Sequence, residues 1–75
     1  MVKVVKYFIA EIKERPDRNV ELALIEDYSL KEAKKRLYKC FYKEQVKSIK
    51  RVPQSIVDEK KGRIVYTFPL RHAKR

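Results

Sequence analysis

Apolar and polar residues alternate along several stretches of the chain, a pattern that indicates β-strands. The first stretch runs from Val2 to Glu14, and its middle is apolar at even and odd positions, which predicts a strand partly covered on both sides. A turn around Pro16 follows, and then a second strand from Val20 to Ile25. The clearest alternation runs from Ile64 to Leu70. We expect the first two strands to pair as an antiparallel hairpin.

A further stretch, Val46 to Val57, also has the composition of a strand, but Pro53 interrupts it. Because proline cannot donate a hydrogen bond to a neighbouring strand, we expect this strand to lie at a sheet edge or to bulge at the proline. Residues 58–62 end in Gly62, which is the chain's one glycine and can adopt positive φ. They are predicted to form a hairpin loop leading to the last strand.

One helix is predicted between the second and third strands, from Leu30 to about Glu44. Ser29 and Glu32 have the spacing of a capping box at its start. One arc of the helical wheel is apolar and is expected to face the sheet: Leu30, Ala33, Leu37, Cys40 and Phe41.

These elements predict a single small α+β domain over residues 1–70, followed by a basic C-terminal tail at residues 71–75. The expected element order is β-β-α-β-β, an antiparallel sheet with one helix packed on one face. A single helix cannot cover both faces of four strands, so the other face should be polar or covered by a partner.

Positive charge is concentrated in the second part of the chain. Residues 1–30 carry five Lys/Arg and six Asp/Glu (net −1), and residues 31–75 carry fifteen and four (net +11), which makes the formal net charge +10. An excess of this size in 75 residues favours a polyanionic partner, either nucleic acid, an anionic membrane or an acidic protein.

The predicted helix carries lysines at successive i, i+4 positions from Lys31 to Lys43, and these repel one another. Only Glu32 with Arg36 offers a compensating pair at that spacing. A solvated surface would explain the helix alone, but further basic groups follow it, and exposed tyrosines among lysines can bond phosphate or stack on bases. The candidate nucleic-acid-binding residues are Lys31, Lys34, Lys35, Tyr38, Lys39, Tyr42, Lys43, Lys47, Lys50, Arg51, Lys60, Lys61, Arg63, Arg71, His72, Lys74 and Arg75.

Catalytic and metal chemistry find little support in the sequence. Cys40 and His72 are the single cysteine and histidine, so neither a disulfide nor a cysteine-based zinc site can form within the chain. No phosphate-binding glycine loop, nucleophile elbow or metalloprotease motif is present. We expect no enzymatic activity, no cofactor, no bound metal and no small-molecule substrate.

Two further expectations concern where the protein works. The longest apolar run, residues 7–10, is too short to cross a bilayer, and the helix lacks the tryptophan typical of membrane-surface helices. We expect a cytoplasmic protein that does not bind membranes. The many charged residues and few amides are typical of thermophilic proteins.

The helix entry Tyr28–Ala33, Tyr38 within the helix and the basic strand Val46–Arg51 together resemble the archaeal ribosomal protein LX family of the large subunit. The resemblance covers residues 4–52. It implies a small basic protein bound to ribosomal RNA, and Lys47, Lys50 and Arg51 match the family's basic strand.

These observations predict a structural RNA-binding protein, in particular an accessory ribosomal protein that contacts rRNA phosphates beside neighbouring ribosomal proteins. Two alternatives stay open. One is a small DNA-binding protein, of chromatin or of viral regulation. The other is a protein-interaction module or inhibitor that docks on an acidic partner by strand addition.

Overall fold

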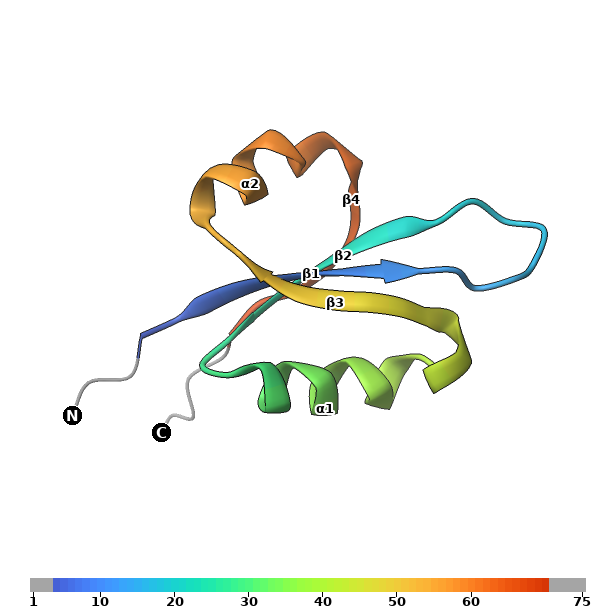
Figure 1. Cartoon of the computed structure of the whole chain (residues 1–75), viewed down its shortest axis with the longest axis horizontal. Coiled ribbons are helices and arrows are strands. Elements are labelled where there is room, and N and C mark those ends of the chain that lie inside the picture. The colour runs from blue at the N-terminus through green and yellow to red at the C-terminus, as the bar shows by residue number, and fades with distance from the viewer. Residues whose placement is uncertain (1–3, 71–75) are drawn as a thin grey trace.

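The computed structural model describes residues 4–70, which form a four-stranded sheet with a helix on each face (Figure 1). The predicted tail at residues 71–75 lies outside the described residues. The strands are β1 (Lys6–Ile12), β2 (Glu21–Asp27), β3 (Val46–Val52) and β4 (Ile64–Phe68). The helices are α1 (Leu30–Cys40) and α2 (Gln54–Glu59), and two 3₁₀ turns are η1 (Lys43–Gln45) and η2 (Lys61–Arg63).

The sheet has the order β3-β1-β2-β4, which confirms the α+β class and corrects the predicted strand arrangement. β1 is antiparallel to both β2 and β3, as the predicted hairpin requires, but β4 is parallel to β2. The sheet is therefore mixed rather than antiparallel. β3 lies at an edge, as predicted, yet it ends before Pro53 and does not pair with β4, which forms the opposite edge.

Residues 53–63 form α2 and η2, not a strand end and hairpin loop, so the predicted third strand is too long and the predicted loop is wrong. Pro53 is the N-cap of α2, and its carbonyl accepts hydrogen bonds from the amides of Ile56 (3.0 Å) and Val57 (3.3 Å). A proline is well tolerated at a helix start, where its missing N–H has no intrahelical partner to lose.

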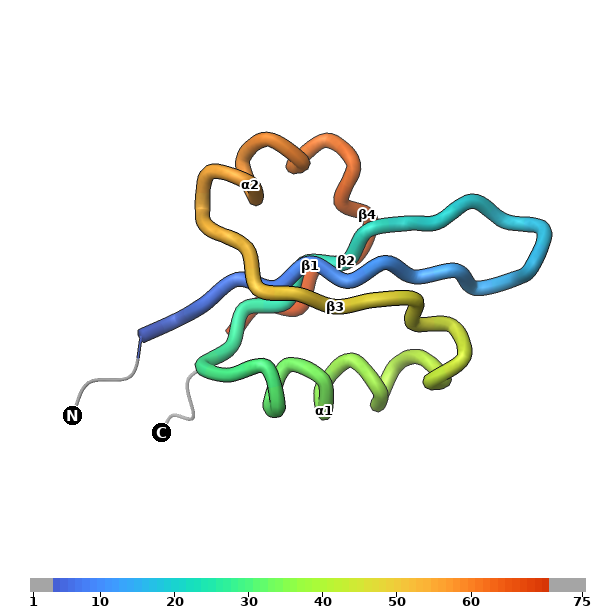
Figure 2. Tube along the Cα trace, in the orientation of Figure 1, coloured from blue at the N-terminus to red at the C-terminus, as the bar shows by residue number. Residues whose placement is uncertain are grey.

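Two crossover connections explain why both faces of the sheet are covered. β2, β3 and β4 point the same way, so β2–α1–β3 and β3–α2–β4 are both crossovers between parallel strands. They run across the sheet in opposite directions, on opposite faces, and therefore have the same hand, as the strong preference for one hand requires (Figure 2).

Each face of the sheet has its own apolar core. On the α1 side, Leu37 packs with Phe8, Ile12 and Ile25, all fully buried. On the α2 side, the core consists of Ile9, Leu22, Leu24, Val52 and Val57. Because successive strand residues point to opposite faces, these two cores account for the apolar middle of β1. We expected the second face of the sheet to be polar or covered by a partner. This expectation is wrong, because α2 covers part of that face.

α1 begins as predicted but ends at Cys40, four residues before the expected Glu44. Ser29 caps its start by accepting a hydrogen bond from the amide of Glu32 at 3.3 Å. At the other end Phe41 turns to extended geometry, and its ring packs edge-on against Tyr66, with 5.0 Å between ring centroids. This aromatic contact favours ending the helix there.

The predicted apolar arc of the helix is correct in its centre and wrong at its ends. Ala33 and Leu37 are fully buried, whereas Leu30 is 41% exposed and Cys40 is exposed. Leu30 and Cys40 are the first and last residues of α1, and the two predicted core positions that fail are therefore those at the helix ends.

Candidate nucleic-acid interface

The outer face of α1 is a surface of exposed lysines. With Ala33 and Leu37 turned toward the sheet and Arg36 partly buried, the remaining positions of α1 face solvent, as the helical period predicts. Tyr38 lies among the lysines and is 41% exposed. We call this surface the α1 lysine face, and its members are Lys31, Lys34, Lys35, Tyr38 and Lys39.

Because α1 ends at Cys40, Tyr42 and Lys43 lie outside the helix on which they were predicted. Lys43 belongs to η1 rather than to the helix, so the i, i+4 column has three lysines and not four. Tyr42 is the N-cap of η1 and is 78% exposed. The side chain of Gln45 accepts from the Tyr42 amide at 2.8 Å and donates to the carbonyl of Glu14 at 3.2 Å. Gln45 therefore ties the connection after α1 to the β1–β2 hairpin.

Ion pairing on the α1 lysine face is limited. Within residues 4–70 there are two salt bridges, and only Lys35–Glu32, at 3.6 Å, lies on this face. Both partners are more than half exposed, so this pair contributes little stability. The sequence spacing suggested a pair between Glu32 and Arg36, but Glu32 pairs with Lys35 instead. The other lysines of this face form no salt bridge with any residue in the range 4–70.

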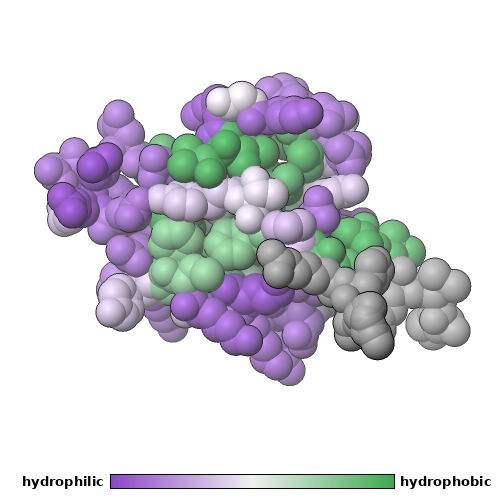
Figure 3. Space-filling view, turned by 180° about the vertical axis from the view of Figure 1, so that it is seen from behind, coloured by the Kyte–Doolittle hydropathy of each residue, from purple (hydrophilic) through white to green (hydrophobic). Residues whose placement is uncertain are grey.

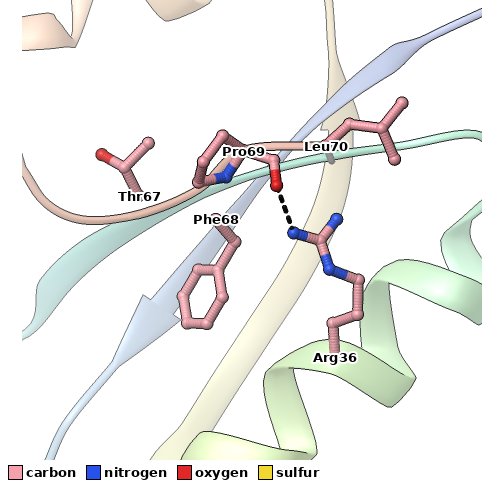
Figure 4. Close-up of a pocket in the computed structure, with 5 residues that line it drawn as sticks. All are labelled: Arg36, Thr67, Phe68, Pro69 and Leu70. Carbon is pink, nitrogen blue, oxygen red and sulfur yellow. Dashed lines mark hydrogen bonds between the residues drawn. The ribbon is translucent and has the colours of Figure 1, made fainter. Parts of the chain in front are cut away.

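Arg36 has a structural role that sequence reasoning missed. Its guanidinium donates to the carboxylate of Asp27 at 3.1 Å, to the carbonyl of Glu26 and to the carbonyl of Pro69 at 2.7 Å (Figure 4). Asp27 is only 4% exposed. Arg36 thus joins α1 to the ends of β2 and β4, and it forms one wall of a cavity of about 360 Å³ with residues 67–70. No sequence spacing signals this contact, because its partners come from β2 and from the segment after β4.

The three basic residues of β3 do not share one face. Lys50 lies opposite Ile9 on the α2 side, and Arg51 lies opposite Phe8 on the α1 side. Lys47 falls at a bulge, where the pairing of β1 with β3 shifts register. All three are exposed on this edge strand. The basic strand therefore presents cations to both faces of the sheet.

The crossover through α2 brings a further set of basic residues close to β3. Lys60 is the C-cap of α2, and Lys61 and Arg63 belong to η2. Lys60 and Arg63 line a cavity of about 230 Å³ together with Lys50, and Lys61 lies outside it. The structure thus unites Lys50, Lys60 and Arg63 from separate segments. Ile9, Glu11, Leu22 and Ser48 complete the cavity, and sequence analysis did not single them out.

On the side of β4, apolar surface separates two groups of exposed charges. Figure 3 shows the side of β4, where a band of apolar and weakly polar residues separates charged residues of α1 below from those of the α2 region above. β4 contributes Val65, which is 55% exposed. The last four candidates, Arg71, His72, Lys74 and Arg75, lie outside the described residues.

Acidic residues of the hairpin surround one tyrosine of β4. The hydroxyl of Tyr66 contacts the carboxylate of Glu14 and lies 3.2 Å from that of Glu21. The hydrogen bond to Glu14, together with burial and the negative charge of both carboxylates, raises the pKa of Tyr66 far above its ordinary value.

The raised pKa of Tyr66 predicts that the stability of the fold falls at alkaline pH. Above about pH 10 the unfolded chain ionises Tyr66 while the folded protein retains the proton, so the free energy of unfolding should fall as pH rises. Tyr66→Phe should reduce this fall, as should Glu14→Gln with Glu21→Gln. Urea denaturation at a series of pH values from about 9 to 11 measures the effect. Identical pH dependence in wild type and Tyr66→Phe would contradict it.

Neither a metal-binding cluster nor a membrane-spanning helix is found within residues 4–70. No group of three or more His, Cys, Asp or Glu side chains there is arranged to hold a metal ion. No helix in the same range has the length and apolar character needed to cross a membrane.

Comparison with known proteins adds no relative: no family model, curated protein or solved structure matches this chain.

Proposed function

We propose that this protein is a structural RNA-binding protein, in particular an accessory ribosomal protein that contacts rRNA phosphates. The observation that carries the proposal is the α1 lysine face, where Lys31, Lys35 and Lys39 stand one helical turn apart and are exposed. Like charges at this spacing destabilise an isolated helix by a few tenths of a kcal/mol, roughly, for each pair. A phosphate backbone along the helix would remove that repulsion.

The side chains of this face suit RNA. Lysines neutralise phosphates without reading sequence, and their contacts position the protein on its target. Tyr38 and Tyr42 are exposed beside them and can stack on unpaired bases or bond a 2′-hydroxyl. α1 and α2 lie on opposite faces of the sheet, so they do not form a helix–turn–helix pair for the DNA major groove. Recognition would depend on RNA shape.

The proposed setting also includes neighbouring ribosomal proteins. The apolar band on the β4 side, with Val65 exposed, is a surface that such a neighbour could cover. This part of the proposal is independent of the phosphate contacts, because the band lies between the charged surfaces and not on them.

A competition experiment tests the proposed function. Labelled structured RNA bound to the full chain is challenged at fixed salt with unlabelled structured RNA or with duplex DNA of equal charge. We expect RNA to compete at least about tenfold better, since the α1 lysine face does not present a groove-reading motif. Equal competition would favour the DNA-binding alternative. In parallel, the native protein should sediment with ribosomes at low salt, and its recovery with an acidic protein, free of nucleic acid, would overturn the proposal.

A further inference from the structure

The cavity on the α2 side of the sheet combines an apolar floor with a cationic rim. Its floor is formed by Ile9 and Leu22, which are 4% and 7% exposed and belong to the α2-side core. Its rim is formed by Lys50 of β3, Lys60 at the end of α2 and Arg63 of η2. The cavity, at about 230 Å³, is smaller than pockets for drug-sized ligands, which begin at about 300 Å³.

The charges around the cavity are not balanced. One carboxylate, that of Glu11, faces three cations, and one of its oxygens already accepts a hydrogen bond from the hydroxyl of Ser48 at 3.0 Å. Within residues 4–70, none of the three cations takes part in a salt bridge. A concave site lined by charge of one sign concentrates its electric field and attracts a counter-ion. The three donors are of the types that bind phosphate oxygens.

The position of the cavity decides where the phosphate comes from. The α1 lysine face points away from one side of the sheet, and the cavity opens on the other side. A stiff RNA helix lying along α1 cannot also reach across the sheet into the cavity. A phosphate bound there would therefore belong to a separate RNA segment.

We propose that the cavity between β3 and η2 binds a backbone phosphate of a second RNA segment, so that the protein bridges two segments from opposite faces of its sheet. Lys50, Lys60 and Arg63 hold the phosphate, and Ile9 and Leu22 give the adjoining sugar or base an apolar surface. This inference rests on the proposed RNA-binding function and adds a second site to it.

The test uses the full chain with two probes, a donor-labelled RNA stem–loop and an acceptor-labelled oligouridylate. Energy transfer between the probes, with one copy of each per protein in sedimentation velocity, reports bridging. Lys50→Ala with Lys60→Ala should weaken the second binding event by about 10- to 100-fold at low salt, because two of the three cations that contact the bound phosphate are lost. Binding of the stem–loop should remain.

Matched variants distinguish the effect of the cavity residues from the effect of lowering the total positive charge. Arg15→Ala with Arg18→Ala removes the same charge from the turn of the β1–β2 hairpin, outside the residues that line the cavity, and it should weaken bridging less than about threefold. Lys50→Arg with Lys60→Arg keeps the cations and should preserve bridging, which guards against misfolding of the alanine variant.

Each remaining outcome overturns a definite part of the proposal. Equal losses in the two alanine variants, or a wild-type protein that binds one RNA only, would overturn the bridging site and leave the proposed function standing. Displacement of the oligouridylate by uridine monophosphate at equal concentration would assign the cavity to free nucleotides and overturn bridging. A wild-type protein that binds neither probe would overturn the proposed function itself.

Discussion

Replacing Lys31, Lys35 and Lys39 by alanine together is expected to weaken RNA binding by about 10²- to 10³-fold at about 50 mM salt. Each lysine that neutralises a phosphate releases condensed counter-ions, so three lost contacts should also lower the slope of log affinity against log salt by about 2 to 3. The three side chains are exposed, and the variant should fold normally. Fluorescence anisotropy titrations over a range of salt concentrations measure both quantities.

A control of equal charge tests whether position matters. Lys13, Arg15 and Arg18 flank the turn of the β1–β2 hairpin, where acidic residues are interspersed with them. Their replacement by alanine also lowers the net charge by three, but they belong to the connection between β1 and β2 (Figure 1) and not to α1. We expect a loss below about tenfold. Similar losses in the two triple variants would show that RNA senses total charge rather than the α1 lysine face.

The wild-type protein should itself respond strongly to salt. If six to ten phosphates are contacted, affinity falls by roughly 10³- to 10⁵-fold between about 50 and 200 mM salt. A flat response would contradict phosphate binding as the main source of affinity.

Arg36→Ala is expected to destabilise the fold by about 2–3 kcal/mol, the largest effect we expect from a single surface cation. The change leaves the buried carboxylate of Asp27 without its cation and removes the link between α1 and the carbonyl of Pro69. The side chain of Arg36 is 29% exposed, which places the estimate below the full cost of about 3–5 kcal/mol for breaking a fully buried pair. Urea denaturation measures the change.

A double-mutant cycle identifies the source of this loss. Asp27→Asn removes the charge that Arg36 compensates, so Arg36→Ala should cost less in that background than in wild type. RNA affinity should stay within about threefold wherever the variant remains folded, since Arg36 is engaged inside the molecule. A variant that keeps wild-type stability but loses RNA affinity would place Arg36 in the RNA interface instead.

Local patterns predicted the elements whose apolar residues repeat regularly. The β1–β2 hairpin and the start of α1 at Ser29 follow from period and capping, whereas β3 lies at an edge although Pro53, from which that position was predicted, belongs to the start of α2. α2 escaped prediction because Ile56 and Val57 are adjacent, and a short apolar pair fits a strand as well as a helix. Its helical identity comes from packing Val57 on the second core.

The candidate interface also has one part that local sequence patterns predict and one part that they do not. Exposure of Lys31, Lys35 and Lys39 depends only on the helical period, and the structure places them as expected. The meeting of Lys50 with Lys60 and Arg63 depends on which edge β4 occupies, and no local pattern contains that information.

By itself, the sequence determined the α+β class, the separation of charge between the two parts of the chain and the lysine-rich outer surface of one helix. These properties depend on residue type and on contacts within a few positions. Only the tertiary structure decided that β4 joins β2 in parallel, that α2 covers the second face and that Arg36 serves the fold rather than a ligand. Such features arise from contacts between segments that are distant in the sequence. These contacts contribute to stability only when the whole chain folds.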